Sequence, residues 1–144
     1  MSPLLRVEQE VGASAERVWS VLTDWERQGE WIPATRVSAH DGHAVGGRIE
    51  ARTGLGPFGF LDTMTITAWD PPRRCEVQHT GRLVRGPGTF EVESLGATRS
   101  RVIWEERLDL PLGMLGRAGW PLVRPLARAA LALALRRFVR TLVR

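Results

Sequence analysis

The chain has 144 residues, of which 43% are hydrophobic and 25% charged, with a formal net charge of +4 and a single cysteine, Cys75. This composition is typical of a globular domain and excludes a disordered or fibrous chain. The length predicts a single domain over residues 1–144. One cysteine excludes an internal disulfide, and a reducing, cytoplasmic environment is expected.

The positive charge belongs to one end of the chain. Residues 1–110 carry 13 Arg and 16 carboxylates, a formal charge of −3, whereas residues 111–144 carry seven Arg and no carboxylate. Because the excess is local, it does not indicate a nucleic-acid-binding protein. The N-terminal residues MSPLLRVEQEVGAS contain no long apolar run, so we expect no secretory signal. The longest apolar run, 129–135, is far shorter than the ~20 residues of a membrane-spanning helix.

The first third of the chain predicts one strand and two helices. Residues 4–11 alternate as a strand does, and Ser14 then offers an N-cap. Apolar residues at helical spacing follow, and a second short helix is expected over 26–31, stopped by Pro33.

The middle of the chain changes to a period of two. It predicts six strands separated by short turn sequences, at about 35–40, 46–53, 62–70, 73–81, 87–95 and 98–110. The short links favour antiparallel pairing in chain order. The outward faces of these strands are rich in Arg and Glu, which we expect to form cross-strand ion pairs.

The C-terminal segment predicts one long helix over 122–143, with Pro121 and Pro125 at its beginning. At 1.5 Å per residue it would run ~33 Å, long enough to cross a sheet. Its arginines form one stripe, and the opposite stripe is apolar: Leu131, Leu135, Phe138 and Leu142. The fold class is therefore α+β, a curved antiparallel sheet wrapped around a long C-terminal helix with an internal cavity between them.

Three stretches carry a resemblance to a known family: VWSVLTDWERQGEWIP, HTGRLVRGPGTFEVE and TRSRVIWEERLDLPLG. Together with the six strands and the final helix, they resemble the START-like (SRPBCC) superfamily, more narrowly its polyketide cyclase/dehydrase and lipid transport group. The resemblance covers essentially the whole chain and implies the helix-grip fold, in the order β-α-α-β6-α. Members include polyketide aromatases and cyclases, ubiquinone-binding proteins and lipid carriers. Most of them share an apolar cavity under the C-terminal helix, and the family has no universal catalytic motif.

The apolar face of each predicted strand should line the cavity, and two polar residues, His79 and Glu106, interrupt it. A buried carboxyl group has a raised pKa and histidine titrates near neutrality, so this pair is the candidate for proton transfer. Alternatively both are hydrated near strand ends or orient a ligand. The candidate ligand-binding residues are Trp31, Phe58, Phe60, Met64, His79, Phe90, Trp104 and Glu106.

Several of these candidates have a second interpretation. Phe58 and Phe60 lie in the Gly-rich run GLGPFGFLD, which suits a cavity mouth or a hairpin tip folded over the core. Trp31 and Trp104 either form flat walls for a ring-shaped ligand or pack in the core. The Gly-rich run lacks the Gly-Lys-Ser/Thr of a phosphate-binding loop, and no cofactor is expected.

The remaining features favour no chemistry of their own. His40 and His43 flank an Asp-Gly turn without a third ligand nearby, so a solvated hairpin is expected and no metal. Cys75 is interpreted as a small buried hydrophobe. The arginine stripe is interpreted as a solvated face, with a membrane surface or an acidic partner as the alternative.

These observations predict a carrier or binding protein for a small hydrophobic ligand, such as a lipid, a quinone or a polyketide. The alternative is a polyketide cyclase, aromatase or dehydratase that uses His79 and Glu106.

Overall fold

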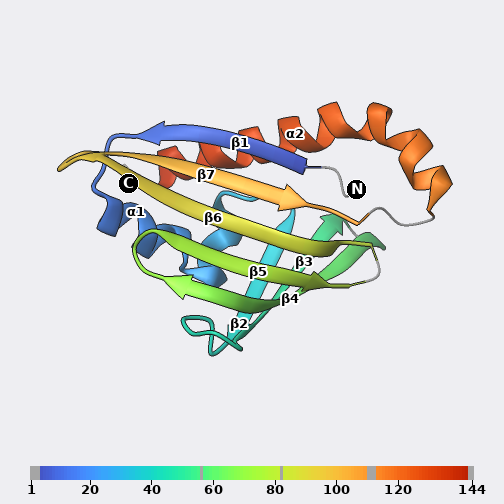
Figure 1. Ribbon diagram of the computed structural model, residues 1–144, viewed down its shortest axis with the longest axis horizontal. Helices are drawn as coiled ribbons and strands as arrows, with labels where there is room; N and C mark the ends of the chain where they lie inside the picture. Colours follow the sequence, from blue (N-terminus) through green and yellow to red (C-terminus); the bar gives the residue numbers. More distant parts are fainter. Residues whose placement is uncertain (1–3, 56, 82, 110–112, 143–144) are drawn as a thin grey trace.

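A single seven-stranded antiparallel sheet, in the order β1-β7-β6-β5-β4-β3-β2, organises the molecule (Figure 1). The computed structural model describes residues 4–55, 57–81, 83–109 and 113–142. The strands are β1 (Leu4–Val11), β2 (Thr35–His40), β3 (Arg48–Leu55), β4 (Phe58–Asp70), β5 (Arg74–Thr80), β6 (Arg85–Gly96) and β7 (Arg99–Arg107). The helices are α1 (Ala15–Leu22), the short 3-10 helix η1 (Trp25–Glu30) and the long α2 (Met114–Leu142).

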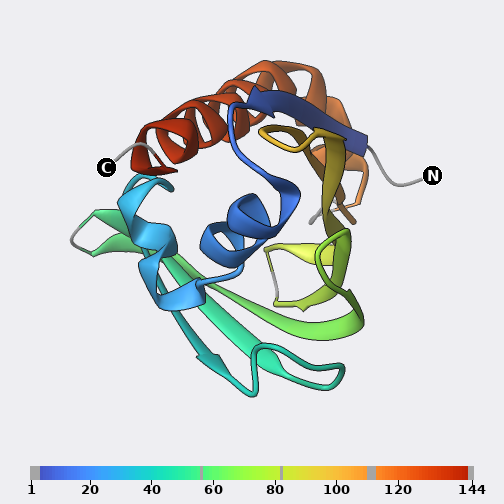
Figure 2. The ribbon, with the colours of Figure 1, turned by 90° about the vertical axis from the view of Figure 1, so that its left-hand side faces the viewer.

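Strands β2 to β7 pair in chain order, and β1 joins the sheet beside β7. Figure 2 shows the sheet curving around α1 and η1, while α2 runs beside β1. This arrangement confirms the predicted α+β class and the pairing in chain order. The apolar residues of the concave face of the sheet and those of the helices that face it form one buried core.

The first helix forms as its sequence predicts. The Ser14 hydroxyl accepts a hydrogen bond from the Arg17 backbone N–H at 3.2 Å, which caps α1. The helix buries Val18, Trp19 and Leu22 against the sheet. In its first turn it is tied to the C-terminal end of α2, because the Arg17 guanidinium donates to the carbonyl of Leu142 at 2.9 Å.

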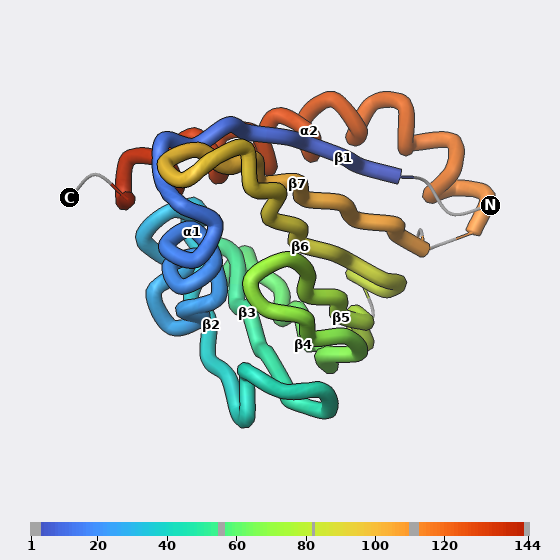
Figure 3. Tube along the Cα trace, turned by 60° about the vertical axis from the view of Figure 1, so that its left-hand side comes forward, coloured from blue at the N-terminus to red at the C-terminus, as the bar shows by residue number. Residues whose placement is uncertain are grey.

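Helix α2 begins at Met114, eight residues before the expected start, and contains Pro121 and Pro125. The expectation that both prolines stand at the helix beginning was wrong. A proline lacks the N–H that would bond the carbonyl four residues earlier. Here those carbonyls belong to exposed residues, Arg117 and Pro121, so water can satisfy them. This N-terminal half extends past the N-terminal end of β1 (Figures 1 and 3).

A bulge in β4 changes which side chains face the core. The register shifts between Ile66 and Ala68, so that Trp69 stands opposite Cys75 and Ala68 opposite Glu76. Trp69 therefore turns inward and packs against Trp19, with ring centroids 5.2 Å apart. Strict alternation from Ile66 would have pointed Ala68 inward, and that expectation was wrong.

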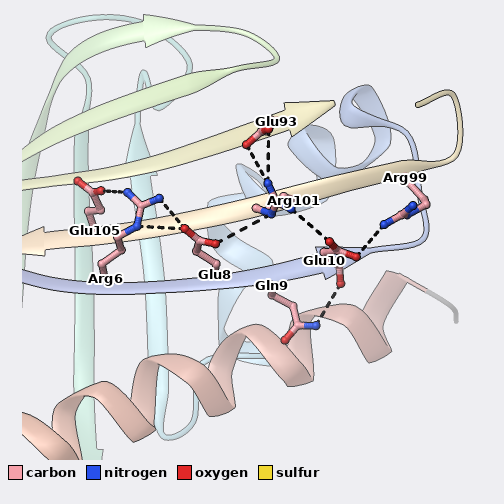
Figure 4. A network of polar contacts seen from close by, with 8 residues as sticks. All are labelled: Arg6, Glu8, Gln9, Glu10, Glu93, Arg99, Arg101 and Glu105. Atoms are coloured by element: carbon pink, nitrogen blue, oxygen red, sulfur yellow. Dashed lines mark hydrogen bonds and ion pairs between the residues drawn. The ribbon is translucent and has the colours of Figure 1, made fainter. Parts of the chain in front are cut away.

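The outer face of the sheet carries the expected cross-strand ion pairs (Figure 4). Arg101 reaches Glu93 on β6 and Glu10 on β1, at 3.4 and 3.2 Å. Arg6 contacts Glu105 on the neighbouring strand. Exposed pairs of this kind contribute little to stability individually.

In the part of the chain that the structure describes, no helix combines the length and apolarity needed to cross a membrane.

Candidate functional site

A cavity of about 330 Å³ lies between the concave face of the sheet and helix α2. Its walls come from η1, from all seven strands of the sheet and from the middle of α2. Most of the wall is apolar, formed by residues such as Ile49, Met64, Val77, Phe90, Trp104 and Leu131. Such a lining suits the apolar body of a small molecule.

Three titratable side chains meet in this wall. His79 on β5 lies between two carboxylates: its Nδ1 is 2.7 Å from Oδ1 of Asp62 on β4, and its Nε2 is 2.7 Å from Oε2 of Glu106 on β7. The His79 side chain is only 4% exposed, and those of Asp62 and Glu106 are 16% and 14% exposed. We call Asp62, His79 and Glu106 the buried triad.

The sheet register brings the buried triad together. His79 stands opposite Met64 on β4, so Asp62, two residues earlier, lies on the same face. Glu106 belongs to β7 and is separated from β5 by strand β6, where Gly88 stands opposite it. A Cβ atom at position 88 would collide with Oε2 of Glu106 and lie 2.9 Å from Nε2 of His79. Glycine at this position is therefore what allows the two side chains to meet.

The buried triad holds its histidine in the charged form. Burial alone would lower the pKa of His79, but hydrogen bonds and charge attraction from Asp62 and Glu106 outweigh it and raise the pKa to about 10. At neutral pH the ring is thus protonated, and each N–H donates to a carboxylate. With two carboxylates and one imidazolium, the triad carries one net negative charge.

Glu106 is also held from its other side. The indole Nε1–H of Trp104 donates to Oε1 of Glu106 at 2.9 Å, so both carboxylate oxygens accept hydrogen bonds. The Trp104 ring in turn packs against Phe90 and Trp31, with centroids 5.0 and 6.1 Å apart. This aromatic cluster fixes the orientation of the carboxylate.

Six of the eight expected ligand-binding residues line the cavity: Phe60, Met64, His79, Phe90, Trp104 and Glu106. Trp31 lies behind the wall, 1% exposed, with its ring packed on Phe90, Trp104 and Phe138. Trp31 therefore packs in the core, which was one of the two interpretations that the sequence allowed.

Phe58 lies outside the cavity and is 82% exposed, contrary to the expectation that it lines the pocket. It stands opposite Leu55 at the tip of the β3–β4 hairpin. The Gly-rich run is therefore a hairpin end, tightened by Gly54 with φ of 142°. Within it, Phe60 lines the cavity.

Asp62 is the member of the buried triad that sequence reasoning missed. The strand over 62–70 was expected to begin at this residue, and its own face was not assigned. The signal was present, because Asp62 has the same parity as Met64 and Ile66.

Neither of the remaining candidates forms a reactive centre. Burial raises the pKa of the Cys75 thiol to about 12, so it stays protonated. His43 donates from Nε2 to the carbonyl of Thr23 at 2.9 Å and packs on Trp69, whereas His40 is exposed. Among residues 4–55, 57–81, 83–109 and 113–142, no three His, Cys, Asp or Glu side chains converge as metal ligands would.

Comparison with known proteins supports this description of the fold. The family model described as polyketide cyclase / dehydrase and lipid transport matches residues 3–143. None of the curated proteins matches the chain.

Three solved structures are similar over nearly their full length. A protein from Thermus thermophilus has a TM-score of 0.79 at 18% identity, covering 98% of this chain and 97% of its own. The Zhui aromatase/cyclase of a Streptomyces species has a TM-score of 0.76 at 18% identity, covering 100% and 97%. A START superfamily protein of Mycobacterium smegmatis has a TM-score of 0.77 at 16% identity, covering 96% of each chain. At these identities the likeness shows the fold.

Proposed function

Because the chain belongs to the polyketide cyclase/dehydrase and lipid transport family, we propose that its internal cavity binds a small hydrophobic ligand, as a carrier or binding protein does. The observation that carries the proposal is an apolar cavity with one polar end, formed by the buried triad. Its volume of about 330 Å³ lies at the lower end of the roughly 300–1,000 Å³ typical of small-molecule sites. This size favours a compact ring system over a lipid with two acyl chains.

A matched pair of alanines on α2 tests ligand binding. Ala130 lines the cavity, whereas its neighbour Ala129 does not, and both are exposed enough to accept a larger side chain. Native mass spectrometry of the full chain purified from cells should show a bound small molecule. Ala130→Trp should fill the cavity and remove that ligand, while Ala129→Trp should retain it. Equal occupancy in both variants would contradict binding in this cavity.

The buried triad favours a second candidate function, a polyketide cyclase, aromatase or dehydratase. In an aldol-type ring closure, a carboxylate accepts the proton from a carbon next to one ligand carbonyl, and that carbon bonds to a second carbonyl carbon. Protonation of that carboxylate ends its hydrogen bond with His79, and the freed N–H of protonated His79 donates its proton to the oxygen that becomes a hydroxyl. The carboxylic acid then returns its proton to His79 through their hydrogen bond, so that the site is restored. In a dehydration, the same carboxylate and His79 then catalyse loss of this hydroxyl as water.

Turnover separates the two functions. If the protein is an enzyme, His79→Gln and Glu106→Gln should abolish conversion of a synthetic poly-β-ketone but keep affinity for the product ring system. The folded state of each variant is checked by circular dichroism, because removing one partner of a buried ion pair is destabilising. If the wild-type protein converts no such substrate yet retains a bound ligand, the carrier function stands and the enzyme function fails.

We also propose that the N-terminal half of α2 faces an anionic lipid surface, from which ligand enters. Large apolar side chains are exposed on this half: Met114, Leu115, Leu122, Val123 and Leu126. The helix carries arginines at both ends and no carboxylate. Ala127 and Leu131, in the same helix, line the cavity. Exposed apolar residues flanked by cations are typical of helices that bind anionic membranes.

A further inference from the structure

The hydrogen-bond donors of the buried triad are already engaged. Both ring N–H groups of protonated His79 donate to carboxylates, and the Trp104 indole N–H donates to Glu106. Both oxygens of Glu106 accept these bonds. For Asp62, Oδ1 accepts from His79, while Oδ2 takes no part in the triad. What this end of the cavity offers to a ligand is therefore a carboxylate oxygen, an acceptor.

Other hydroxyl groups near the cavity do not supply a donor. The Thr35 hydroxyl donates to the carbonyl of Pro33 at 2.9 Å, and the Thr53 hydroxyl must then donate to Thr35, at 3.0 Å. Thr89 is also among the lining residues, but its cross-strand partners Glu76 and Glu105 place its buried hydroxyl on the outer face of the sheet. The Gln28 amide, which also lines the cavity, donates to the carbonyl of Leu22 at 3.0 Å. The Trp31 indole N–H is buried without a hydrogen-bond partner, but Trp31 is not among the described residues that line the cavity. The three threonine hydroxyls therefore offer no donor to a ligand.

The cavity is negatively charged at the end where the Asp62 carboxylate accepts hydrogen bonds. The buried triad carries one net negative charge, and none of the described residues that line the cavity is Arg or Lys. In an apolar surrounding, charge interactions are weakly screened. An anionic ligand placed beside Asp62 would be repelled without a compensating cation.

We infer that the cavity selects ligands that donate a hydrogen bond from a neutral ring hydroxyl, such as phenols, hydroquinones or enols, and discriminates against carboxylates and against ethers or quinones of the same shape. The inference rests on the proposed function of ligand binding and names its ligand class. The ligand hydroxyl donates to Oδ2 of Asp62. Hydrogen bonds to charged acceptors are among the stronger ones in proteins, so the discrimination should amount to about 10-fold or more in dissociation constant.

Three probes with one ring system test this selectivity: 1-naphthol, 1-methoxynaphthalene and 1-naphthoate. Trp25 and Trp104 line the cavity, so binding can be followed at neutral pH by tryptophan fluorescence and confirmed by calorimetry. The wild-type protein should bind 1-naphthol about 10-fold or more tightly than the other two. This comparison needs no variant, so it does not depend on whether a substitution disturbs folding.

A matched pair of substitutions on β4 then assigns the effect to Asp62. Asp62→Asn removes one charge and adds an amide donor. The affinity for 1-naphthol should therefore fall, and the affinity for 1-naphthoate should rise. Asp70→Asn, on the exposed end of the same strand, should keep the wild-type order.

The outcomes separate this inference from the proposed function. If the wild-type protein binds all three probes equally, or 1-naphthoate most tightly, ligand binding stands and the selectivity is wrong. If it binds none of them, binding of a small ring system is contradicted, and the inference falls with it. If Asp62→Asn and Asp70→Asn both keep the wild-type order, Asp62 is not the acceptor.

Discussion

At the scale of single residues, the unusual feature is a cation buried between two anions beside an apolar cavity. A buried ion pair is weak evidence for stability, because apolar residues of similar volume often stabilise as well. Here His79 is held by Asp62 and Glu106, and Glu106 is held by Trp104. Stability alone therefore does not explain why these charged side chains lie on the inner face of the sheet, and the proposed ligand-binding function supplies a reason.

The raised pKa of His79 predicts how stability depends on pH. Between the ordinary value of 6.5 and about 10, the folded protein keeps a proton that the unfolded chain has released. The contribution of His79 is therefore complete below pH 6.5 and is lost as the pH rises through about 10. In urea denaturation across this window, the free energy of unfolding should fall for the wild type, and this decline should be absent in His79→Gln.

The exposed histidine provides the control for that measurement. The His40 side chain is 87% exposed, so His40→Gln should keep the decline of the wild type. Parallel slopes in the wild type and His79→Gln would contradict a proton held by the buried triad.

Gly88 gives a second prediction at this scale. The Cβ of Gly88→Ala would collide with Glu106 and crowd His79, and overpacking of this kind destabilises by roughly 1–3 kcal/mol. Ligand affinity should fall as well, because the triad must move. Gly12→Ala is the matched control, since nothing lies within 4 Å of its added Cβ. Thermal melts and probe binding measure both effects, and a Gly88→Ala protein with wild-type stability and affinity would refute the steric argument.

The buried triad and Gly88 show what residue patterns can and cannot predict. Period-two alternation correctly brought His79, Glu106 and Trp104 to one face. Asp62 was missed because a face is hard to assign at a strand end. Gly88 fell within the strand expected at 87–95 and lies inside β6, but nothing in the sequence indicated that it makes room for Glu106 and His79. A glycine that makes room for distant side chains has the same local signature as one that bends the chain, so only the assembled sheet distinguishes them.

At the scale of elements, α2 is divided into a packed half and an exposed half. Phe138 is fully buried and packs on Trp31, whereas Leu126 is 74% exposed. Phe138→Ala should destabilise by roughly 3–5 kcal/mol. Leu126→Ala should change the free energy of unfolding by no more than about 0.5 kcal/mol. Urea denaturation checks both values, and similar losses at the two positions would mean that the exposed half is also packed.

Element boundaries were predictable where local chemistry determines them. The first strand at 4–11, the Ser14 cap and the strand at 35–40 agree with the structure. The start of α2 was not predictable, because Pro121 and Pro125 argue against a helix interior and only exposure to water makes them tolerable. The bulge after Ile66 was likewise hidden, since one extra residue leaves no mark in the alternation of a single strand.

At the scale of the whole molecule, the exposed half of α2 predicts binding to anionic membranes. The full chain should sediment with vesicles that contain phosphatidylglycerol at low salt and much less with pure phosphatidylcholine. Leu126→Glu should reduce the bound fraction several-fold. Val45→Glu, a substitution of another exposed apolar residue in the loop between β2 and β3, is the control and should bind as the wild type does. Failure of the wild type to sediment with either vesicle would exclude the membrane partner.

The pairing of β1 with β7 has a consequence for how the chain is made. Val7 stands opposite Trp104, so β1 leaves the ribosome long before the strand with which it pairs. At roughly 5–20 residues per second, it waits on the order of 5–20 s with its apolar face uncovered. The wall of the cavity that holds Glu106 is completed only when β7, which is made much later, pairs with β1.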